Sequence, residues 1–238
     1  MVDGDYAYLG LRGNGWRIFD VSDPTAITEV AEDDADDAED LAVADGVLYV
    51  IDADGIRTYD VTDPTSPTVL ATQLVLSGTS KEIALRPNVA FVAAANAGLV
   101  AVDISTPSAP VELDSLSTSA NAVALAVHKK RVYVAHSDGF TIVDSTVPSS
   151  LTELGTFDGD RGGSVAVSRR HAFLAGDDTI SIDAPTLQIV DVTAPATPVS
   201  IDASFNDYDD PVMMRFSNGL VFVSADDDGQ VHIIDTCP

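Results

Sequence analysis

The chain has few of the residues on which several classes of protein depend. Its 238 residues include one cysteine, Cys237 beside the C-terminus, so disulfide bonds play no part in the fold. Lysine occurs only at Lys81, Lys129 and Lys130. No apolar run approaches the length that spans a membrane, and no signal peptide is recognisable. We therefore expect no disulfide framework and no membrane span in this chain.

Acidic residues far outnumber basic ones. The chain carries 38 acidic and 12 basic residues, for a formal net charge of −26, and the acids are 32 aspartates and 6 glutamates. Such an excess destabilises the compact state unless salt screens it. Abundant aspartate with scarce lysine is typical of proteins from salt-loving organisms. We expect no nucleic-acid partner, because phosphate binding needs clustered lysine and arginine.

One motif recurs six times along the chain. A strand-like run ends in an aspartate, and a proline follows within four residues. The aspartates are Asp20, Asp60, Asp103, Asp144, Asp191 and Asp235, at spacings of 40, 43, 41, 47 and 44 residues. Each copy also contains four short alternating or apolar runs, such as "LAVAD", "VLYVID", "GIRTYDV" and "TVLATQL" in the second copy. This pattern predicts four antiparallel strands, which we name A to D, in each repeat unit.

Two more residue types recur at fixed places in the repeat. Strand B carries an aromatic residue at Tyr8, Tyr49, Phe91, Tyr133, Phe173 and Phe222, and a glycine precedes strand C at Gly15, Gly55, Gly98, Gly139 and Gly229. Four-stranded units repeated without helices are typical of propeller blades, and such units must stack to bury both faces. We predict an all-β fold, a β-propeller of about six four-stranded blades whose terminal blades are incomplete or shared, with the aromatic residues in the core.

The repeat sets the expected domain boundaries. We predict a single propeller domain over residues 1–238, with repeat units that end near Pro24, Pro64, Pro107, Pro148, Pro195 and Pro238. Only "MVDG" stands where the first strand A belongs, and the last copy stops before a strand D, so 22 strands are expected. Either blades of three strands flank the closure of the ring, or the chain is part of a longer protein.

The strand-B aromatic, the "G-x-x-x-x-D" strand C and the following "D-x-x-x-P-x-x-P" together resemble the LVIVD repeat of bacterial and archaeal β-propellers. The resemblance extends over essentially the whole chain. The second, third and fifth copies match best, with Pro64 and Pro67, Pro107 and Pro110, and Pro195 and Pro198. It implies a secreted or cell-surface propeller, here of a halophilic archaeon or bacterium, and it supplies no catalytic residues.

The recurring aspartate and proline have a structural explanation. An aspartate at a strand end can accept a hydrogen bond from the backbone N–H two residues on, and proline ends the strand and presets the turn. Repeat proteins use such residues to punctuate every unit. We therefore expect these positions to shape turns rather than to bind a ligand.

Other acids gather in the D–A and B–C connections, which emerge on one face of a propeller. The candidate ligand-binding residues on this acidic loop face are Asp36, Asp37, Asp40, Asp160, Asp177, Asp178, Asp209 and Asp210. The opposite face, with the A–B turns, carries Arg86, Lys129, Lys130, Arg131, Arg169 and Arg170. The fifth copy also has a lengthened B–C connection from Gly176 to Thr186. This connection is either a functional loop or tolerated surface variation.

Aspartates one residue apart can supply several oxygens to calcium. The metal candidates are Asp52 and Asp54 in "IDADGI", and Asp226 and Asp228 in "SADDDGQ". Calcium is the one cofactor that the pattern suggests. The alternative is that Asp-Gly forms a hairpin turn and the remaining acids keep the surface hydrated.

Sequence signatures of catalysis are missing. The chain has no "G-x-S-x-G", "H-E-x-x-H", phosphate loop or dinucleotide fingerprint, and His128, His136, His171 and His232 fall on separate parts of the repeats. Two functions stay open. One is a non-enzymatic interaction or structural module that binds a protein, peptide or glycan on the acidic loop face. The other is a hydrolase or lyase on a propeller scaffold, with carboxylates near the axial channel and calcium to assist them.

Overall fold

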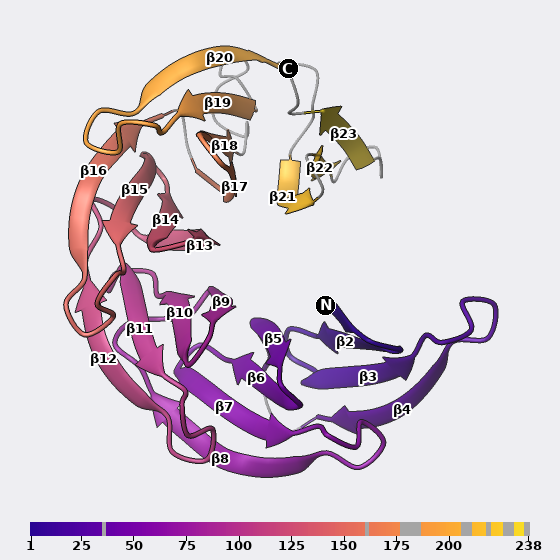
Figure 1. The fold of residues 1–238 in the computed structure, drawn as a ribbon. Coiled ribbons are helices and arrows are strands. Elements are labelled where there is room, and N and C mark those ends of the chain that lie inside the picture. Colours follow the sequence, from indigo (N-terminus) through magenta and orange to yellow (C-terminus); the bar gives the residue numbers. More distant parts are fainter. Residues whose placement is uncertain are drawn as a thin grey trace. The chain divides into compact units, whose positions relative to one another are not determined.

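The computed structural model consists of antiparallel β-sheets (Figure 1). It describes residues 1–34, 37–159, 162–176, 187–205, 211–217, 220–225 and 231–235. Among these residues there are 23 strands and no helix. The described part of the chain accordingly holds no helical segment able to cross a membrane.

The chain divides into two compact units, and three sheets lie in the first, which comprises Met1–Ala95 and Val100–Ser115. Its strands are β1 (Val2–Asp3), β2 (Tyr6–Gly10), β3 (Trp16–Asp20), β4 (Thr28–Asp33), β5 (Asp40–Ala44), β6 (Val47–Ile51), β7 (Gly55–Asp60), β8 (Thr68–Val75), β9 (Glu82–Arg86), β10 (Val89–Ala93), β11 (Leu99–Asp103) and β12 (Val111–Leu116). Each sheet has four strands in chain order, and β5 of the second sheet contacts β9 of the third. Strand A of the second sheet therefore lies against strand A of the third, and β5 also contacts β2, which is strand B of the first sheet.

The second unit, Asn96–Leu99 and Leu116–Pro238, holds the remaining sheets. Its strands are β13 (Ala122–His128), β14 (Arg131–His136), β15 (Gly139–Asp144), β16 (Thr152–Asp158), β17 (Ser164–Ser168), β18 (His171–Ala175), β19 (Leu187–Asp191), β20 (Val199–Phe205), β21 (Pro211–Ser217), β22 (Leu220–Ala225) and β23 (Val231–Asp235). The fourth and fifth sheets have four strands and the last has three. Strand A again contacts strand A, in the pairs β13 with β17 and β17 with β21.

The predicted order of strands A to D is observed in each four-stranded sheet, but the predicted number of blades is not. Five sheets have four strands, rather than about six, and β21, β22 and β23 form a three-stranded sheet. The prediction of one domain over residues 1–238 stays a prediction.

The expectation that the first copy lacks strand A is wrong. Val2 pairs with Ala7 and Asp3 with Tyr6, so β1 is a strand of two residues. The turn at Gly4, where φ is +56°, allows this pairing. Two residues are too few to show a strand's alternation, so this strand could not be recognised from the residue pattern.

The repeated aspartates form the predicted turns. The Asp20 carboxylate accepts a hydrogen bond from the backbone N–H of Ser22 at 2.9 Å. The equivalent bonds reach Asp60 from Thr62, Asp103 from Ser105, Asp144 from Thr146 and Asp191 from Thr193, at 2.7–2.9 Å. Hydrogen bonds from the side chain and from the backbone of the same serine or threonine hold the pKa of each of the five carboxyls below its usual value.

The residue after each aspartate ties the C–D connection to the A–B turn of the same sheet. In the second sheet the Val61 N–H donates to the Gly46 carbonyl at 2.8 Å, and in the third the Ile104 N–H donates to Asn88 at 3.0 Å. The same bond joins Ser145 to Lys130 and Val192 to Arg170, both at 2.8 Å. The A–B turn and the C–D connection therefore lie at the same end of each of these sheets.

The glycine before strand C is required by a close approach of two strands. A Cβ atom at Gly55 would lie 2.0 Å from the carbonyl oxygen of Leu74 on strand D, and one at Gly139 would lie 2.0 Å from that of Phe157. No other residue fits such a contact without moving the backbone. The glycine is therefore a structural feature of the blade and not a ligand site.

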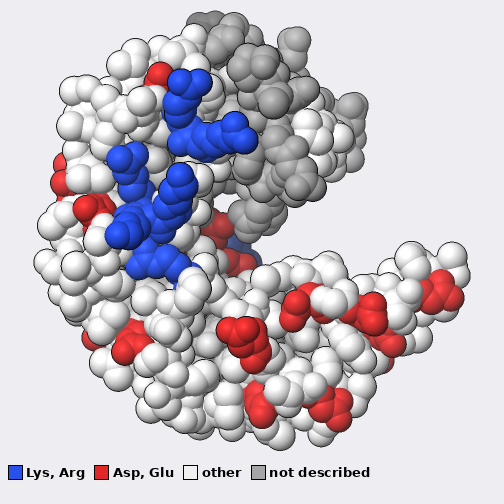
Figure 2. Space-filling model, viewed as in Figure 1, with Lys and Arg blue, Asp and Glu red and all other residues white. Residues whose placement is uncertain are grey.

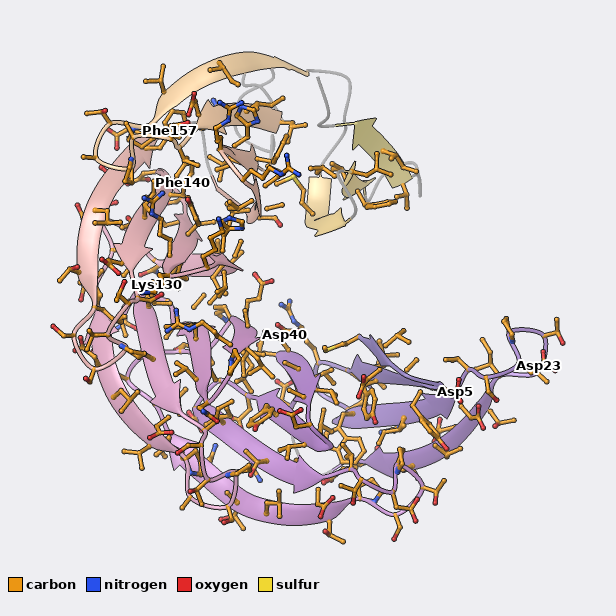
Figure 3. All side chains as sticks on the ribbon, viewed as in Figure 1. Asp5, Asp23, Asp40, Lys130, Phe140 and Phe157 are labelled. Carbon is orange, nitrogen blue, oxygen red and sulfur yellow. The ribbon has the colours of Figure 1, made fainter. Side chains whose placement is uncertain are left out.

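Five of the six predicted strand-B aromatic residues lie in the core, whereas Phe222 is only partly buried. Tyr8, Tyr49, Phe91, Tyr133 and Phe173 are all at most 4% exposed. The clusters that contain them join neighbouring sheets, for example Tyr133 and Ile142 of the fourth sheet with Val165 of the fifth. Other aromatic pairs add to this packing, such as Phe140 stacked on Phe157 at 5.3 Å (Figure 3). Hydrophobic contact between sheets thus holds each unit together.

Candidate functional site

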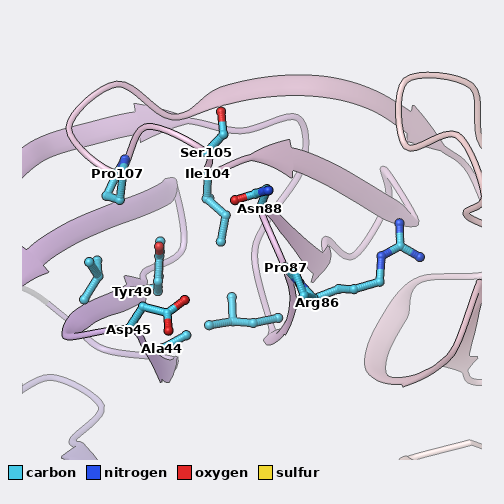
Figure 4. Close-up of a pocket in the computed structure, with 11 residues that line it drawn as sticks. Ala44, Asp45, Tyr49, Arg86, Pro87, Asn88, Ile104, Ser105 and Pro107 are labelled. Atoms are coloured by element: carbon cyan, nitrogen blue, oxygen red, sulfur yellow. The ribbon is translucent and has the colours of Figure 1, made fainter.

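A cavity of about 390 Å³ opens between the second and third sheets of the first unit (Figure 4). It lies at the end of the sheets that carries the A–B turns and the C–D connections. Apolar side chains of Val47, Leu85, Pro87, Ile104 and Pro107 form much of its lining, and polar groups come from Asp45, Tyr49, Asn88 and Ser105. Apolar walls with a few polar groups are typical of a ligand pocket.

Turn chemistry places the polar groups at the mouth of this cavity. Asp45 and Gly46 both have positive φ, of 52° and 74°, as the tight hairpin between β5 and β6 requires. Asn88 has a φ of 64° and follows Pro87, which is the residue pattern of a type II turn. These turns hold Asp45 and Asn88 on opposite sides of the cavity (Figure 4).

Hydrogen bonding between sheets fixes the remaining wall. The hydroxyl of Thr58, on β7 of the second sheet, donates to the carbonyl of Pro107 at 2.6 Å. Thr58 is fully buried, so this bond is shielded from water. The C–D connection of the third sheet is therefore held against the second sheet and keeps the cavity preformed.

The polar groups of the cavity suit binding rather than catalysis. Burial, and then the nearby Asp45 carboxylate, raise the pKa of the Tyr49 hydroxyl, so it stays a neutral donor at pH 7. The Arg86 side chain points away from the cavity (Figure 4), with its guanidinium 5.0 Å from the centre of the Phe91 ring in a cation–π contact. The cavity lining includes no serine, cysteine or threonine paired with a histidine.

Sequence reasoning did not find this cavity. Its lining residues come from two adjacent repeats, and they meet only when the sheets of those repeats pack together. Pro87 and Asn88 are a recognisable turn signal, and Arg86 was noted only as one of the cations on the A–B turns. Nothing in the linear pattern showed that Ile104 and Pro107 would complete a hollow there.

Two of the eight predicted ligand-binding acids lie in the described part of the chain, and both accept hydrogen bonds from the backbone of residues distant in the sequence. The Asp37 carboxylate accepts a hydrogen bond from the backbone N–H of Gly13. The Asp40 carboxylate accepts one from the backbone N–H of Ile83, at 3.0 Å. Asp36, Asp160, Asp177, Asp178, Asp209 and Asp210 lie outside the described residues, as does the long connection after Gly176.

The predicted metal residue Asp52 has its oxygens engaged within its own sheet. It accepts hydrogen bonds from the N–H groups of Asp54 and Gly55, both at 2.8 Å, and from the side chains of Gln73 and Arg57 at 3.0–3.3 Å. Asp226 and Asp228 lie outside the described residues. Among the described residues, no three acidic, histidine or cysteine side chains are grouped to hold a metal. The calcium site stays a prediction.

His136 is the buried histidine whose neighbours most resemble a catalytic pair. It ends β14, with Nε2 3.4 Å from the Ser119 hydroxyl and 3.1 Å from that of Thr141. The N–H of Asp138 donates to Nδ1 at 3.3 Å, so the neutral ring carries its proton on Nε2. Burial lowers the pKa of His136, which keeps this neutral form at pH 7. Nε2 is then a donor and cannot take the proton of Ser119, so the pair is not a nucleophile with its base.

Repeated four-stranded antiparallel sheets, packed strand A against strand A, define the β-propeller class. Solved structures agree at the level of the fold. The β-propeller domain of Myceliophteria_thermophila Cps50 (Swd1) has a TM-score of 0.74 at 12% identity and covers 97% of this chain and 79% of its own. A chain of the Mitotic Checkpoint Complex has a TM-score of 0.77 at 13% identity, and the match covers 97% of this chain and 73% of that one. A chain of the Nidogen/Laminin Complex has a TM-score of 0.62 at 14% identity, and the match covers 98% of this chain and 90% of that one.

The sequence adds the family. The LVIVD repeat model matches residues 1–33, 35–72, 77–118 and 120–159, so the chain belongs to the LVIVD-repeat family. These matches cover the first four copies, whereas the sequence pattern predicted the repeat along the whole chain. No curated protein matches the chain.

Proposed function

We propose that this chain is a non-enzymatic protein-binding module. The observation that carries the proposal is the preformed cavity of about 390 Å³, whose apolar walls and polar turn residues Asp45 and Asn88 offer a place for side chains of a partner. Structures with the same fold come from the Nidogen/Laminin Complex and the Mitotic Checkpoint Complex, which are assemblies of proteins. Propellers present their connections at the ends of the sheets, which suits contact with another chain.

The acidic loop face is a second proposed contact surface of the same module, for a protein, peptide or glycan. It is supported by the density of aspartate in the D–A and B–C connections. Asp37 and Asp40 make internal hydrogen bonds, so this surface depends on the other acids. We give the cavity precedence because its walls and polar groups are defined.

We also propose that the module acts at the cell surface or outside the cell of a halophile. The net charge of −26 supports this, since molar salt screens the repulsion that such a charge creates. The resemblance to secreted and surface propellers points the same way. The hydrolase or lyase alternative is not favoured by a specific observation, because the Ser119 and His136 pair lacks a base.

A cavity-blocking variant tests the main proposal. Ser105 is exposed at the cavity, and its backbone N–H bonds Asp103, so Ser105→Trp fills the opening and keeps the turn. Ser22→Trp is the matched control, because Ser22 holds the same position of the first copy and makes the same bond to Asp20. We expect wild type and Ser22→Trp to capture the same partner in molar salt, and Ser105→Trp to lose it. Equal capture by both variants would place the partner elsewhere. Chelator-sensitive polysaccharide cleavage would overturn the non-enzymatic assignment.

A further inference from the structure

Two adjacent hairpin turns in the second unit concentrate positive charge. They contain Lys129, Lys130, Arg131, Arg169 and Arg170, five of the 12 lysines and arginines of the whole chain. The first turn joins β13 to β14 and the second joins β17 to β18, and β13 contacts β17, so the turns belong to neighbouring sheets. Lysine and arginine side chains gather on this face of the molecule (Figure 2), and Lys130 is labelled in Figure 3. We call these five residues the basic turns.

The cations of the basic turns are presented to solvent. Lys129, Lys130, Arg169 and Arg170 are exposed, and Arg131 is partly buried. The main-chain carbonyls of Lys130 and Arg170 accept the hydrogen bonds that hold the C–D connections. The side chains take no part in those bonds, so their charge is not needed for the turn itself.

The backbone of these turns would fold more easily with other residues. Lys129 has a φ of 56° and Arg169 a φ of 45°, where residues other than glycine, asparagine and aspartate are strained. The equivalent turn of the second sheet uses Asp45 and Gly46 for the same purpose. The second unit thus has lysine or arginine at positions where glycine would reduce the backbone strain. The chain has only 12 lysines and arginines in all.

The charges of the basic turns act on the titratable groups beside them. Burial, and then the charges of Lys129 and Arg131, lower the pKa of His128. The carboxyls of Asp144 and Asp191 lie close to these turns. Their pKa values are lowered mainly by the hydrogen bonds from Thr146 and Thr193, and to a smaller extent by the nearby cations. These two acids offset part of the positive charge of the basic turns.

We propose that the basic turns bind a short segment of a partner polypeptide that is rich in aspartate and glutamate. Lysine offers a point charge and arginine a planar fork that pairs with carboxylates. The segment must be short because the patch spans two turns of a chain whose net charge is −26, so a long uniform polyanion would extend over a repelling surface. Carboxylates spaced along a peptide also fit a few cations that have Asp144 and Asp191 nearby better than a dense phosphate backbone does.

A labelled acidic peptide tests this proposal. The probe has the sequence "EDDADDAED", which is that of residues 32–40 of this chain. Its binding to the whole chain is measured by fluorescence anisotropy in about 0.05 M salt, where screening is weak. The test variant is Lys130→Glu with Arg170→Glu. The matched control is Lys81→Glu with Arg12→Glu, which makes the same change of charge on exposed or partly exposed residues of the first unit.

We expect the test variant to bind the peptide at least about tenfold more weakly than wild type, and the control to stay within about twofold, since tenfold corresponds to roughly one strong charged contact. Circular dichroism and thermal melting show whether both variants fold. Equal weakening in the two variants would overturn the proposal, because it would trace the effect to net charge. Equal binding of the peptide with each acid replaced by its amide, or tighter binding of duplex DNA or polyphosphate, would also overturn it. This result is independent of the Ser105→Trp experiment, which concerns the cavity of the other unit.

Discussion

The carboxylate of Asp40 accepts a hydrogen bond from the backbone N–H of Ile83, at 3.0 Å, and so joins the first residue of β5 to the second residue of β9. The Ser164 hydroxyl makes the equivalent bond in the other unit, where it accepts from the N–H of Met214 at 3.1 Å. Both bonds link strand A of one sheet to strand A of the next. A polar side chain at the start of strand A is thus part of the packing between sheets.

Substitution of Asp40 tests this link. In Asp40→Ala the Ile83 N–H loses its acceptor, and we expect a loss of about 1–3 kcal/mol in the free energy of unfolding. Asp40→Asn keeps an acceptor oxygen and should lose less. Denaturant unfolding of the three proteins measures the difference. If the asparagine variant is as unstable as the alanine variant, the negative charge matters and the hydrogen bond alone does not.

Phe91 tests the role of the strand-B aromatic residues. It is fully buried, and Phe91→Ala should reduce the free energy of unfolding by about 3–5 kcal/mol, because the removed ring leaves a cavity. Val111→Ala on strand D of the same sheet is the control, since Val111 is 55% exposed and should change stability by less than about 0.5 kcal/mol. A loss below about 1 kcal/mol in Phe91→Ala would show that the aromatic row contributes little to the core.

Alanine substitutions at two glycines distinguish the cost of a steric clash from the cost of backbone strain. Gly55→Ala places a methyl group 2.0 Å from the Leu74 carbonyl, so β7 and β8 must separate, and we expect a loss of several kcal/mol or failure to fold. Gly13→Ala meets nothing within 4 Å but has a φ of +75°, so its loss should be about 1–2 kcal/mol. Thermal melts of both variants give the comparison. Similar melting temperatures would mean that the two strands separate easily.

Acidification should first raise and then lower the stability of the fold, and salt should remove the first of these two effects. In low salt, acidification from pH 7 towards about 4 should raise the melting temperature, because protonation reduces the repulsion within a chain of net charge −26. The five repeat aspartates act the other way. Their pKa is lowered in the folded state, so their contribution is present above the unfolded value of about 3.9 and is lost as the pH falls through the folded value.

The measurement is the melting temperature against pH in low salt and in about 1 M salt, where the screening length is about 3 Å. We expect a rise and then a steep fall in low salt, and only the fall in high salt. A Thr62→Val variant removes one hydroxyl donor to Asp60 and should make the fall shallower. Indifference of the melting temperature to salt would contradict the halophilic interpretation.

Local features of the fold could be predicted from sequence because they repeat. The Asp60 turn, the Gly55 position and the buried Phe91 each occur at a fixed place in every well-formed copy. Their causes also lie within a few residues, in turn chemistry and strand alternation. The two-residue strand β1 was missed because pairing through a turn needs no such pattern.

Features that join one sheet to the next could not be predicted in this way. Asp40 was interpreted as a surface ligand, since its acceptor role depends on where Ile83 lies in the neighbouring sheet. His136 is buried at the end of β14 against Thr141, and its position in the repeat gave no indication of that burial. The cavity at Arg86 likewise requires contacts from two copies. Spacing along the chain gives the period of the repeats but not the register between them.

The bond between the C–D connection and the A–B turn has a consequence for how such proteins change over evolutionary time. Its acceptor is a main-chain carbonyl, at Gly46, Asn88, Lys130 or Arg170. The bond itself does not depend on the side chain at that position, although the positive φ of Gly46 and Asn88 favours glycine or asparagine in those two turns. Mutation can alter the chemistry of this end of a blade one turn at a time without loss of the scaffold. An engineer could exchange these two-residue turns between blades for the same reason.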